Sequence, residues 1–132
     1  MADLRSGQCL CGAVSYRAGG LRDIWYCHCR QCRYATGHFM AACRTERARL
    51  NWNGALSWSP HSGSSEIARC AKCGSPLFWH QPESATVSVL AGSLDDTAGL
   101  TTPGHIFAGE KGAYYDIADG LPQWQGHPEG GC

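Results

Sequence analysis

The chain has 132 residues, of which 43 % are hydrophobic and 17 % are charged, and its formal charge balances at zero. This length predicts one domain over residues 1–132, and the balanced charge argues against a nucleic acid or an anionic membrane as the main partner. Residues 1–10 lack the apolar run of a signal peptide, and the ~18 consecutive apolar residues of a membrane span occur nowhere. We therefore expect a soluble, cytoplasmic protein.

Short strands separated by turn residues are predicted along most of the chain. Apolar and polar residues alternate in strand fashion at 13–18 (AVSYRA) and 86–91 (TVSVLA). Other strands are predicted at residues 23–27, 39–44, 48–52, 56–58, 66–68, 77–80, 105–107 and 112–117. Asn53-Gly54 is a strong signal for a two-residue hairpin between the strands at 48–52 and 56–58.

Helix is predicted only as a turn over residues 30–36, which Gly37 ends, and as one further turn within the segment SLDDTAGLTTPG. The Gly- and Pro-rich tail, residues 125–132, is expected to be irregular and mobile. The predicted fold is mainly β, built from several small antiparallel sheets.

Nine cysteines are the most informative residues in this composition. In a reducing compartment clustered cysteines bind metal or do chemistry more often than they form disulfides, and an odd count fits a disulfide framework poorly. Cys43 lies in an apolar stretch and is expected in the core, and Cys132 is expected to be a loose end. The other seven fall into two pairs and a triad: Cys9/Cys11, Cys70/Cys73 and Cys27/Cys29/Cys32.

The two pairs together supply the four ligands of a closed zinc site. Gly12 and Gly74 follow the pairs directly, where a zinc knuckle must turn sharply. We therefore assign a structural zinc that closes a long loop of chain, with these ligands: Cys9, Cys11, Cys70 and Cys73. In the alternative, one cysteine of the second pair completes the triad, and one thiolate is stranded. A thioredoxin-like role for that pair would need a βαβ context, which is missing.

The triad of Cys27, Cys29 and Cys32 can hold a zinc ion while leaving its fourth tetrahedral position open, which is typical of catalytic sites. The alternative is a second structural zinc completed by Cys43, His28 or His38. Since His28 lies between two ligands, its ring is expected to point away from the metal. The remaining histidines are scattered, and each is interpreted as a solvated or packed side chain: His61, His80, His105 and His127.

With these motifs, the chain resembles the glutathione-dependent formaldehyde-activating family, also called S-(hydroxymethyl)glutathione synthases. The matching features, in the order of the family, are GxCxCGAVxY at 7–16, CHCxxCRxxTG at 27–37, CxxCGxPLF at 70–78, GSLDD at 92–96, PxHIF at 103–107 and DGLPxW at 119–124. The resemblance covers nearly the whole chain. It departs at Tyr114, where the family often has a tryptophan after its basic residue, and this difference is expected to alter the pocket wall.

The resemblance implies a set of coiled antiparallel sheets similar to the Rab-interacting zinc chaperone fold. It also implies a structural zinc on the two cysteine pairs and an open, catalytic zinc on the triad. A substrate thiol would bind the open zinc as a thiolate and attack an aldehyde carbon. With glutathione and formaldehyde, as the resemblance implies, the product would be S-(hydroxymethyl)glutathione, and the expected activity is that of a carbon–sulfur lyase or synthase in formaldehyde detoxification.

Glutathione carries two carboxylates, and Arg side chains match carboxylates well. Four basic residues are therefore candidate substrate contacts, although each could equally be a solvated surface side chain: Arg30, Arg33, Arg44 and Lys111. Two other functions stay open. One is a non-catalytic zinc module that binds a macromolecule, in which a fourth protein ligand closes the triad. The other is an open zinc acting on another thiol or carbon–sulfur substrate.

Overall fold

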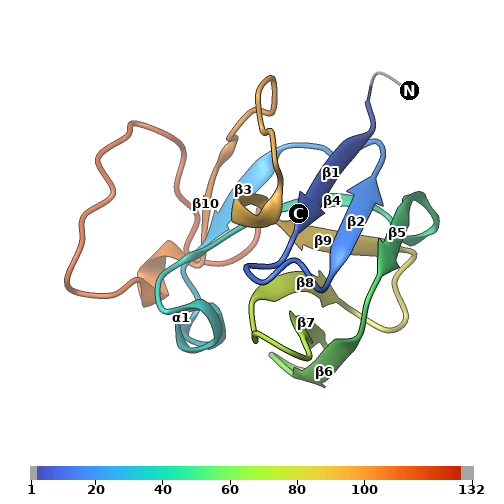
Figure 1. Cartoon of the computed structure of the whole chain (residues 1–132). Helices are drawn as coiled ribbons and strands as arrows, with labels where there is room; N and C mark the ends of the chain where they lie inside the picture. Colours follow the sequence, from blue (N-terminus) through green and yellow to red (C-terminus); the bar gives the residue numbers. More distant parts are fainter. Residues whose placement is uncertain (1–2, 129–132) are drawn as a thin grey trace.

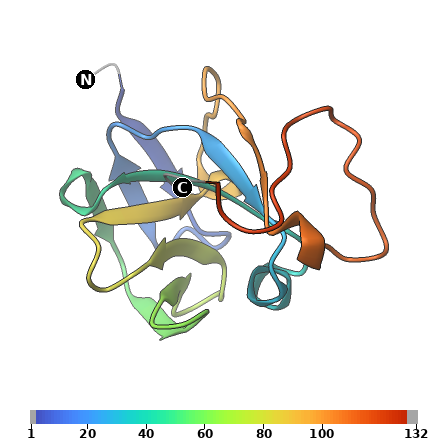
Figure 2. The ribbon, with the colours of Figure 1, turned by 180° about the vertical axis from the view of Figure 1, so that it is seen from behind.

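The computed structural model describes residues 3–128, which form two β-sheets and one short α-helix. A three-stranded sheet has the order β1 (Arg5–Gln8), β2 (Ser15–Ala18), β5 (Leu50–Asn53). A seven-stranded sheet has the order β10 (Gly104–Ile106), β3 (Ile24–Cys27), β4 (Met40–Glu46), β9 (Thr86–Leu90), β8 (Pro76–His80), β7 (Glu66–Cys70), β6 (Leu56–Pro60). The smaller sheet and the loop after residue 110 lie on opposite sides of the molecule (Figures 1 and 2).

The mainly β prediction is confirmed, but the larger sheet joins more strands than the small sheets expected. All of its neighbouring strands are antiparallel except β10 and β3, which run parallel. Three short 3-10 segments follow strands or loops: η1 (Arg47–Arg49), η2 (Ala91–Ser93) and η3 (Ala108–Glu110). None of the helices in residues 3–128 has the length and apolar character needed to cross a membrane.

The helix α1 (Arg30–Thr36) forms where the sequence predicts it, because both of its ends are capped. The Sγ of Cys29 accepts a hydrogen bond from the backbone N–H of Cys32 at 3.3 Å and so caps the first turn. Gly37 ends the helix in the left-handed region at φ 81°, and its N–H donates to the Arg33 carbonyl at 2.9 Å. Glycine suits this position because a Cβ atom would disfavour the left-handed conformation.

The two faces of the larger sheet differ in what they cover, because side chains alternate along each strand. On β9, Val87 and Val89 face the core between the two sheets. There the ring of Phe78 packs edge-on against Tyr16 of the smaller sheet, with centroids 5.0 Å apart. On the opposite face, Leu90 joins a second apolar cluster that contains Cys29 and Cys32. One cysteine cluster therefore lies on the face directed away from the smaller sheet.

The predicted hairpin at Asn53-Gly54 is wrong. β5 pairs with β2 in the smaller sheet, whereas β6 pairs with β7 in the larger one. Gly54 has a φ of 102°, and a side chain there would clash with the backbone carbonyl of Ala13. The glycine is needed because the chain passes close to the first cysteine turn as it crosses from one sheet to the other.

The strand predicted at residues 112–117 is also absent; this segment is a loop. The Lys111 ammonium donates to the carbonyls of Gly112 at 3.2 Å and Tyr115 at 2.6 Å, which holds the loop against itself. The neighbouring edge of β10 is occupied by a later part of the chain, since His105 donates to the Pro122 carbonyl and accepts from the Trp124 N–H, both at 2.9 Å. No free edge remains there for residues 112–117 to pair with.

Part of the expected mobile tail has defined contacts. The N–H of Phe107 donates to the Gly126 carbonyl at 3.1 Å, and the Phe107 ring packs edge-on against His127 with centroids 4.8 Å apart. Because Phe107 packs against the apolar cluster that contains Cys29 and Cys32, these contacts place the start of the tail beside those cysteines. Residues 129–132, including Cys132, lie outside the described part of the chain.

Candidate metal centres and the pocket beside them

The first cysteine cluster brings together residues that are 59 positions apart in the sequence, as Cys11 and Cys70 show. Two turns build it, and each ends in a glycine with left-handed backbone geometry, Gly12 at φ 80° and Gly74 at φ 81°. The Gly12 N–H donates to the Cys9 carbonyl at 3.2 Å, and the Gly74 N–H donates to the Cys70 carbonyl at 2.9 Å. The four Sγ atoms lie within 4.8 Å of one another: Cys9, Cys11, Cys70 and Cys73.

Backbone N–H groups point at these sulfurs, as a thiolate site requires. Val14 donates to Cys9 Sγ at 3.3 Å, and Lys72 and Cys73 donate to Cys70 Sγ at 3.3 and 3.4 Å. A hydrogen bond with the Ser75 hydroxyl lowers the pKa of the Cys73 thiol to about 5. Four sulfurs with such donors suit a zinc ion, which favours tetrahedral thiolate sites. This cluster could therefore hold a metal ion.

The second cluster forms where β3 ends and α1 begins. Cys27 is the last residue of β3, Cys29 caps the helix, and Cys32 lies in its first turn. The Cys32 thiol donates to Cys27 Sγ at 3.4 Å, and all three Sγ atoms lie within 4.8 Å of one another. Cys29 and Cys32 are buried, while Cys27 is partly exposed. The cysteines of residues 3–128 are free thiols, with no disulfide among them.

Hydrogen bonds between the three thiols shift their pKa values in different directions. Bonds from Cys27 and Cys32 lower the pKa of Cys29, whereas the bond to Cys29 raises the pKa of Cys27 to about 12. The pKa of Cys32 is raised by the hydrogen bonds to its two neighbours and by burial. Hydrogen bonding within the triad therefore favours the thiolate at Cys29 over Cys27 and Cys32, and a bound cation would displace the protons that remain on the ligands.

The residues considered as a fourth ligand all point elsewhere. Cys43 faces the core between the sheets, where its Sγ donates to the Val89 carbonyl at 3.6 Å. The ring of His28 is directed away from the triad, as expected, and bonds to Tyr115 and His105. His38 bonds to the hydroxyl of Tyr114. Tyr114 is an exposed residue, and it does not line the pocket described below.

His61 is the residue near the triad that sequence reasoning missed. It follows β6 in a turn in which its N–H donates to the Ser65 carbonyl at 2.9 Å. Its Nε2 atom lies 3.5 Å from Cys32 Sγ, although it is not part of the group whose ligand atoms all lie within 4.8 Å of one another. Only the pairing of β6 with β7 brings this loop to the triad.

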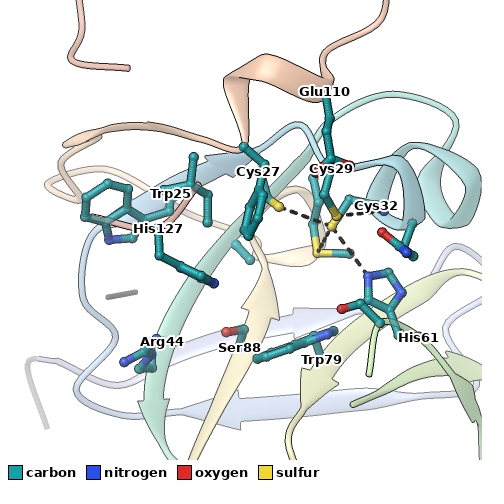
Figure 3. Close-up of a pocket in the computed structure, with 16 residues that line it drawn as sticks. Trp25, Cys27, Cys29, Cys32, Arg44, His61, Trp79, Ser88, Glu110 and His127 are labelled. Carbon is teal, nitrogen blue, oxygen red and sulfur yellow. Dashed lines mark hydrogen bonds between the residues drawn. The ribbon is translucent and has the colours of Figure 1, made fainter. Parts of the chain in front are cut away.

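A pocket of about 190 Å³ opens beside the triad. Figure 3 shows the three cysteines on one side of it and Arg44, Ser88 and Trp79 on the opposite side. His127 and Trp25 lie at one end of this view, and His61 lies at the other. The pocket is lined mainly by apolar side chains, with Glu110 and Arg44 as its charged residues.

Only one of the four predicted anion contacts, Arg44, lines this pocket. Arg33 instead donates from Nε to the Glu110 carbonyl at 3.2 Å, and Lys111 holds the loop carbonyls described above. Arg30 is exposed, and its backbone N–H donates to Glu110 Oε1 at 3.0 Å. The structure therefore does not bring these three cations into the pocket.

A hydrogen-bonded chain of side chains lies behind the triad. His105 Nε2 lies 2.8 Å from Asp119 Oδ2, and His105 Nδ1 lies 2.8 Å from His28 Nε2. Because the carboxylate accepts, His105 donates to it and in turn accepts from His28, whose Nδ1 accepts from the Tyr115 hydroxyl at 2.6 Å. Burial lowers the pKa of His28 to about 4, so its ring is neutral at pH 7. These hydrogen bonds fix the ring of His28, the residue between Cys27 and Cys29.

Replacing His105 with phenylalanine should lower the free energy of unfolding by about 1–3 kcal/mol, because the buried His28 N–H loses its acceptor. The ring volume is largely kept, so the loss would come from the hydrogen bonds. Denaturant unfolding measures the effect. The control is Asp116→Asn, which changes an exposed carboxylate in the loop that also carries Asp119. If H105F were as stable as wild type, these hydrogen bonds would not stabilise the fold.

The protein is thus of the mainly β class with two cysteine clusters that could hold metal, one of them beside a pocket. The chain belongs to the glutathione-dependent formaldehyde-activating enzyme family, whose model matches residues 4–110. This match confirms the family that the motifs indicate. It places the chain in a family whose chemistry concerns glutathione and formaldehyde.

Among solved structures, the chain is similar to the crystal structure of a Rhodobacter sphaeroides protein, with a TM-score of 0.56 and 23 % sequence identity. The similarity covers 74 % of this chain and 97 % of that one. At this identity the likeness concerns the fold alone. No curated protein matches the chain.

Proposed function

We propose that the protein joins a thiol to an aldehyde at the triad of Cys27, Cys29 and Cys32. The proposed substrates are glutathione and formaldehyde, and the product is S-(hydroxymethyl)glutathione. The protein would then be a cytoplasmic carbon–sulfur lyase acting as a synthase in formaldehyde detoxification. One observation carries the proposal: within residues 3–128, the three sulfurs form a potential metal site beside a pocket, and no fourth protein ligand belongs to the group.

Two zinc ions with different roles are part of the proposal. We assign the structural one to the cluster with four sulfurs: Cys9, Cys11, Cys70 and Cys73. The triad would hold the other. When bound there, zinc supplies a cationic centre that lowers the pKa of a substrate thiol.

The protein's own side chains would position the reactants and move one proton. The substrate sulfur attacks the carbonyl carbon, a carbon–sulfur bond forms, and the carbonyl oxygen becomes a hydroxyl by taking up a proton. We assign this proton to His61, which would accept it from the thiol and return it to the oxygen, because its Nε2 is 3.5 Å from Cys32 Sγ. Trp25 and Phe107 line the pocket and would exclude water from the reacting groups.

Replacing His61 with glutamine should lower kcat/KM for the adduct-forming reaction by about 100-fold, the lower end of the usual range for a lost acid–base group. Zinc content should not change. Exchange between free formaldehyde and the glutathione adduct, followed by NMR at several glutathione concentrations, measures the rate. His80→Gln is the matched control, because His80 bonds to the Ser84 carbonyl and does not line the pocket.

A second candidate function is a non-catalytic zinc module, and the position of His61 is the observation that favours it. If His61 moved onto the metal, the triad would be closed and no thiol could bind. H61Q would then lose about one zinc ion per chain, and wild-type protein would not accelerate the exchange. The expected likeness to the Rab-interacting zinc chaperone fold, which would permit such a module, remains a prediction.

A further inference from the structure

The floor of the pocket is one face of the seven-stranded sheet. Strand pairing sets Trp25 opposite Ala42, and it sets Ser88 of β9 between Arg44 of β4 and Trp79 of β8. All five side chains line the pocket. Because Ala42 and Ser88 are small while the two tryptophans are large, the floor is hollow between two aromatic rings. Three of these residues, Arg44, Ser88 and Trp79, lie across the pocket from the cysteine triad (Figure 3).

Arg44 is a cation without a partner on this floor. Within residues 3–128 its guanidinium forms no hydrogen bond, ion pair or ring contact, in contrast to Arg33, Arg47 and Arg49. Glu110, the other charged residue of the pocket, accepts a hydrogen bond from the Arg30 N–H, so it is engaged at the helix. A guanidinium that faces an apolar pocket favours a carboxylate ligand, which it can bind through two parallel hydrogen bonds.

The size of the pocket limits what can bind between Arg44 and the triad. Its 190 Å³ is below the range of about 300–1,000 Å³ found for sites that enclose a drug-sized ligand. A tripeptide such as glutathione belongs to that larger class of ligand. Its peptide groups would also need hydrogen-bond partners, which a mainly apolar lining supplies poorly.

We propose that the pocket favours a small thiol that ends in a carboxylate over the tripeptide glutathione, which would bind the same site more weakly. The sulfur would lie at the triad, the hydrocarbon chain between Trp25 and Trp79, and the carboxylate on Arg44. This inference rests on the proposed function in that it takes the triad to be a thiol-binding site. It goes further by naming the substrate class and the residue that selects it.

Calorimetric titration of the zinc-loaded protein tests the proposal with mercaptoacetate, 3-mercaptopropionate and 4-mercaptobutyrate. The neutral probe is 3-mercaptopropionamide, and glutathione is the tripeptide probe. We expect at least one carboxylate to bind more tightly than glutathione and roughly 10- to 100-fold more tightly than the amide, as charge-assisted hydrogen bonds imply. The chain length that binds best would report the spacing between the sulfur site and Arg44.

Arg44→Gln should abolish the preference for the carboxylate while leaving the affinity for the amide unchanged. Arg17→Gln, an exposed arginine on the smaller sheet, should keep the wild-type preference. Ser88→Leu should weaken binding of every probe because it fills the hollow, with zinc content unchanged.

Two outcomes would overturn the inference in different ways. The inference about Arg44 and a small carboxylate would be wrong if glutathione bound most tightly, or if R44Q left the ratio of carboxylate to amide affinity unchanged. Either result would still be consistent with thiol binding at the triad. Failure of every thiol to bind zinc-loaded protein would overturn both this inference and the proposed function.

Discussion

Replacing Cys70 with serine should unfold most of the chain at room temperature. Cys70 is buried at the end of β7, and its sulfur accepts N–H groups from Lys72 and Cys73 and contacts Cys11 Sγ at 3.9 Å. Structural zinc in small domains contributes an apparent binding free energy of about 10–16 kcal/mol, which exceeds the stability of many domains of this size. Loss of a thiolate from this cluster should therefore remove both the metal and the fold.

Circular dichroism during heating, together with zinc analysis, measures this effect. The matched control is Cys43→Ala, because Cys43 is equally buried but lies outside both clusters. C43A should keep its zinc and lose only about 1 kcal/mol of stability, as expected for removing one small buried group. A Cys70→Ser variant that melts like wild type and binds as much zinc would refute the structural zinc at this cluster.

Replacing Cys29 with serine should remove the second zinc ion and the activity while leaving the fold intact. The substitution is selective because Cys29 is the N-cap of α1, and a serine hydroxyl can accept the same Cys32 N–H. Zinc should fall from about two ions per chain to about one. Formation of the glutathione adduct should fall to the rate without enzyme.

Zinc should be measured on protein purified without added metal or chelator, and the fold should be compared by circular dichroism. His80→Gln again serves as a variant that should keep both zinc ions. A wild-type protein with a single zinc ion that C29S leaves in place would mean that the triad is not a metal site, and the proposed function would lose its main support.

Much of the arrangement of the cysteines is predictable from the local sequence. The spacings within 9–12, 27–32 and 70–74 predict the three cysteine groups, because cysteines a few residues apart can reach one metal ion. At the two pairs, the glycine that follows also allows the sharp turn of a zinc knuckle. Grouping the two pairs into one site followed from ligand number, and the sulfurs of that cluster do lie together. The helix over residues 30–36 was also predictable, since a cap and a glycine stop act within a few residues.

Tertiary structure alone decided what surrounds the triad. His61 reaches Cys32 through the pairing of β6 with β7, and Asp119 reaches His28 through His105. No quoted motif contains His61, and the motifs that contain His105 and Asp119 do not indicate that these side chains meet His28, because the partners are distant in sequence. The same reason explains the wrong hairpin: Asn53-Gly54 is a local turn signal, but the two flanking strands pair with partners in different sheets. Arg44 became distinct from Arg30, Arg33 and Lys111 only when strand register placed it on the pocket floor.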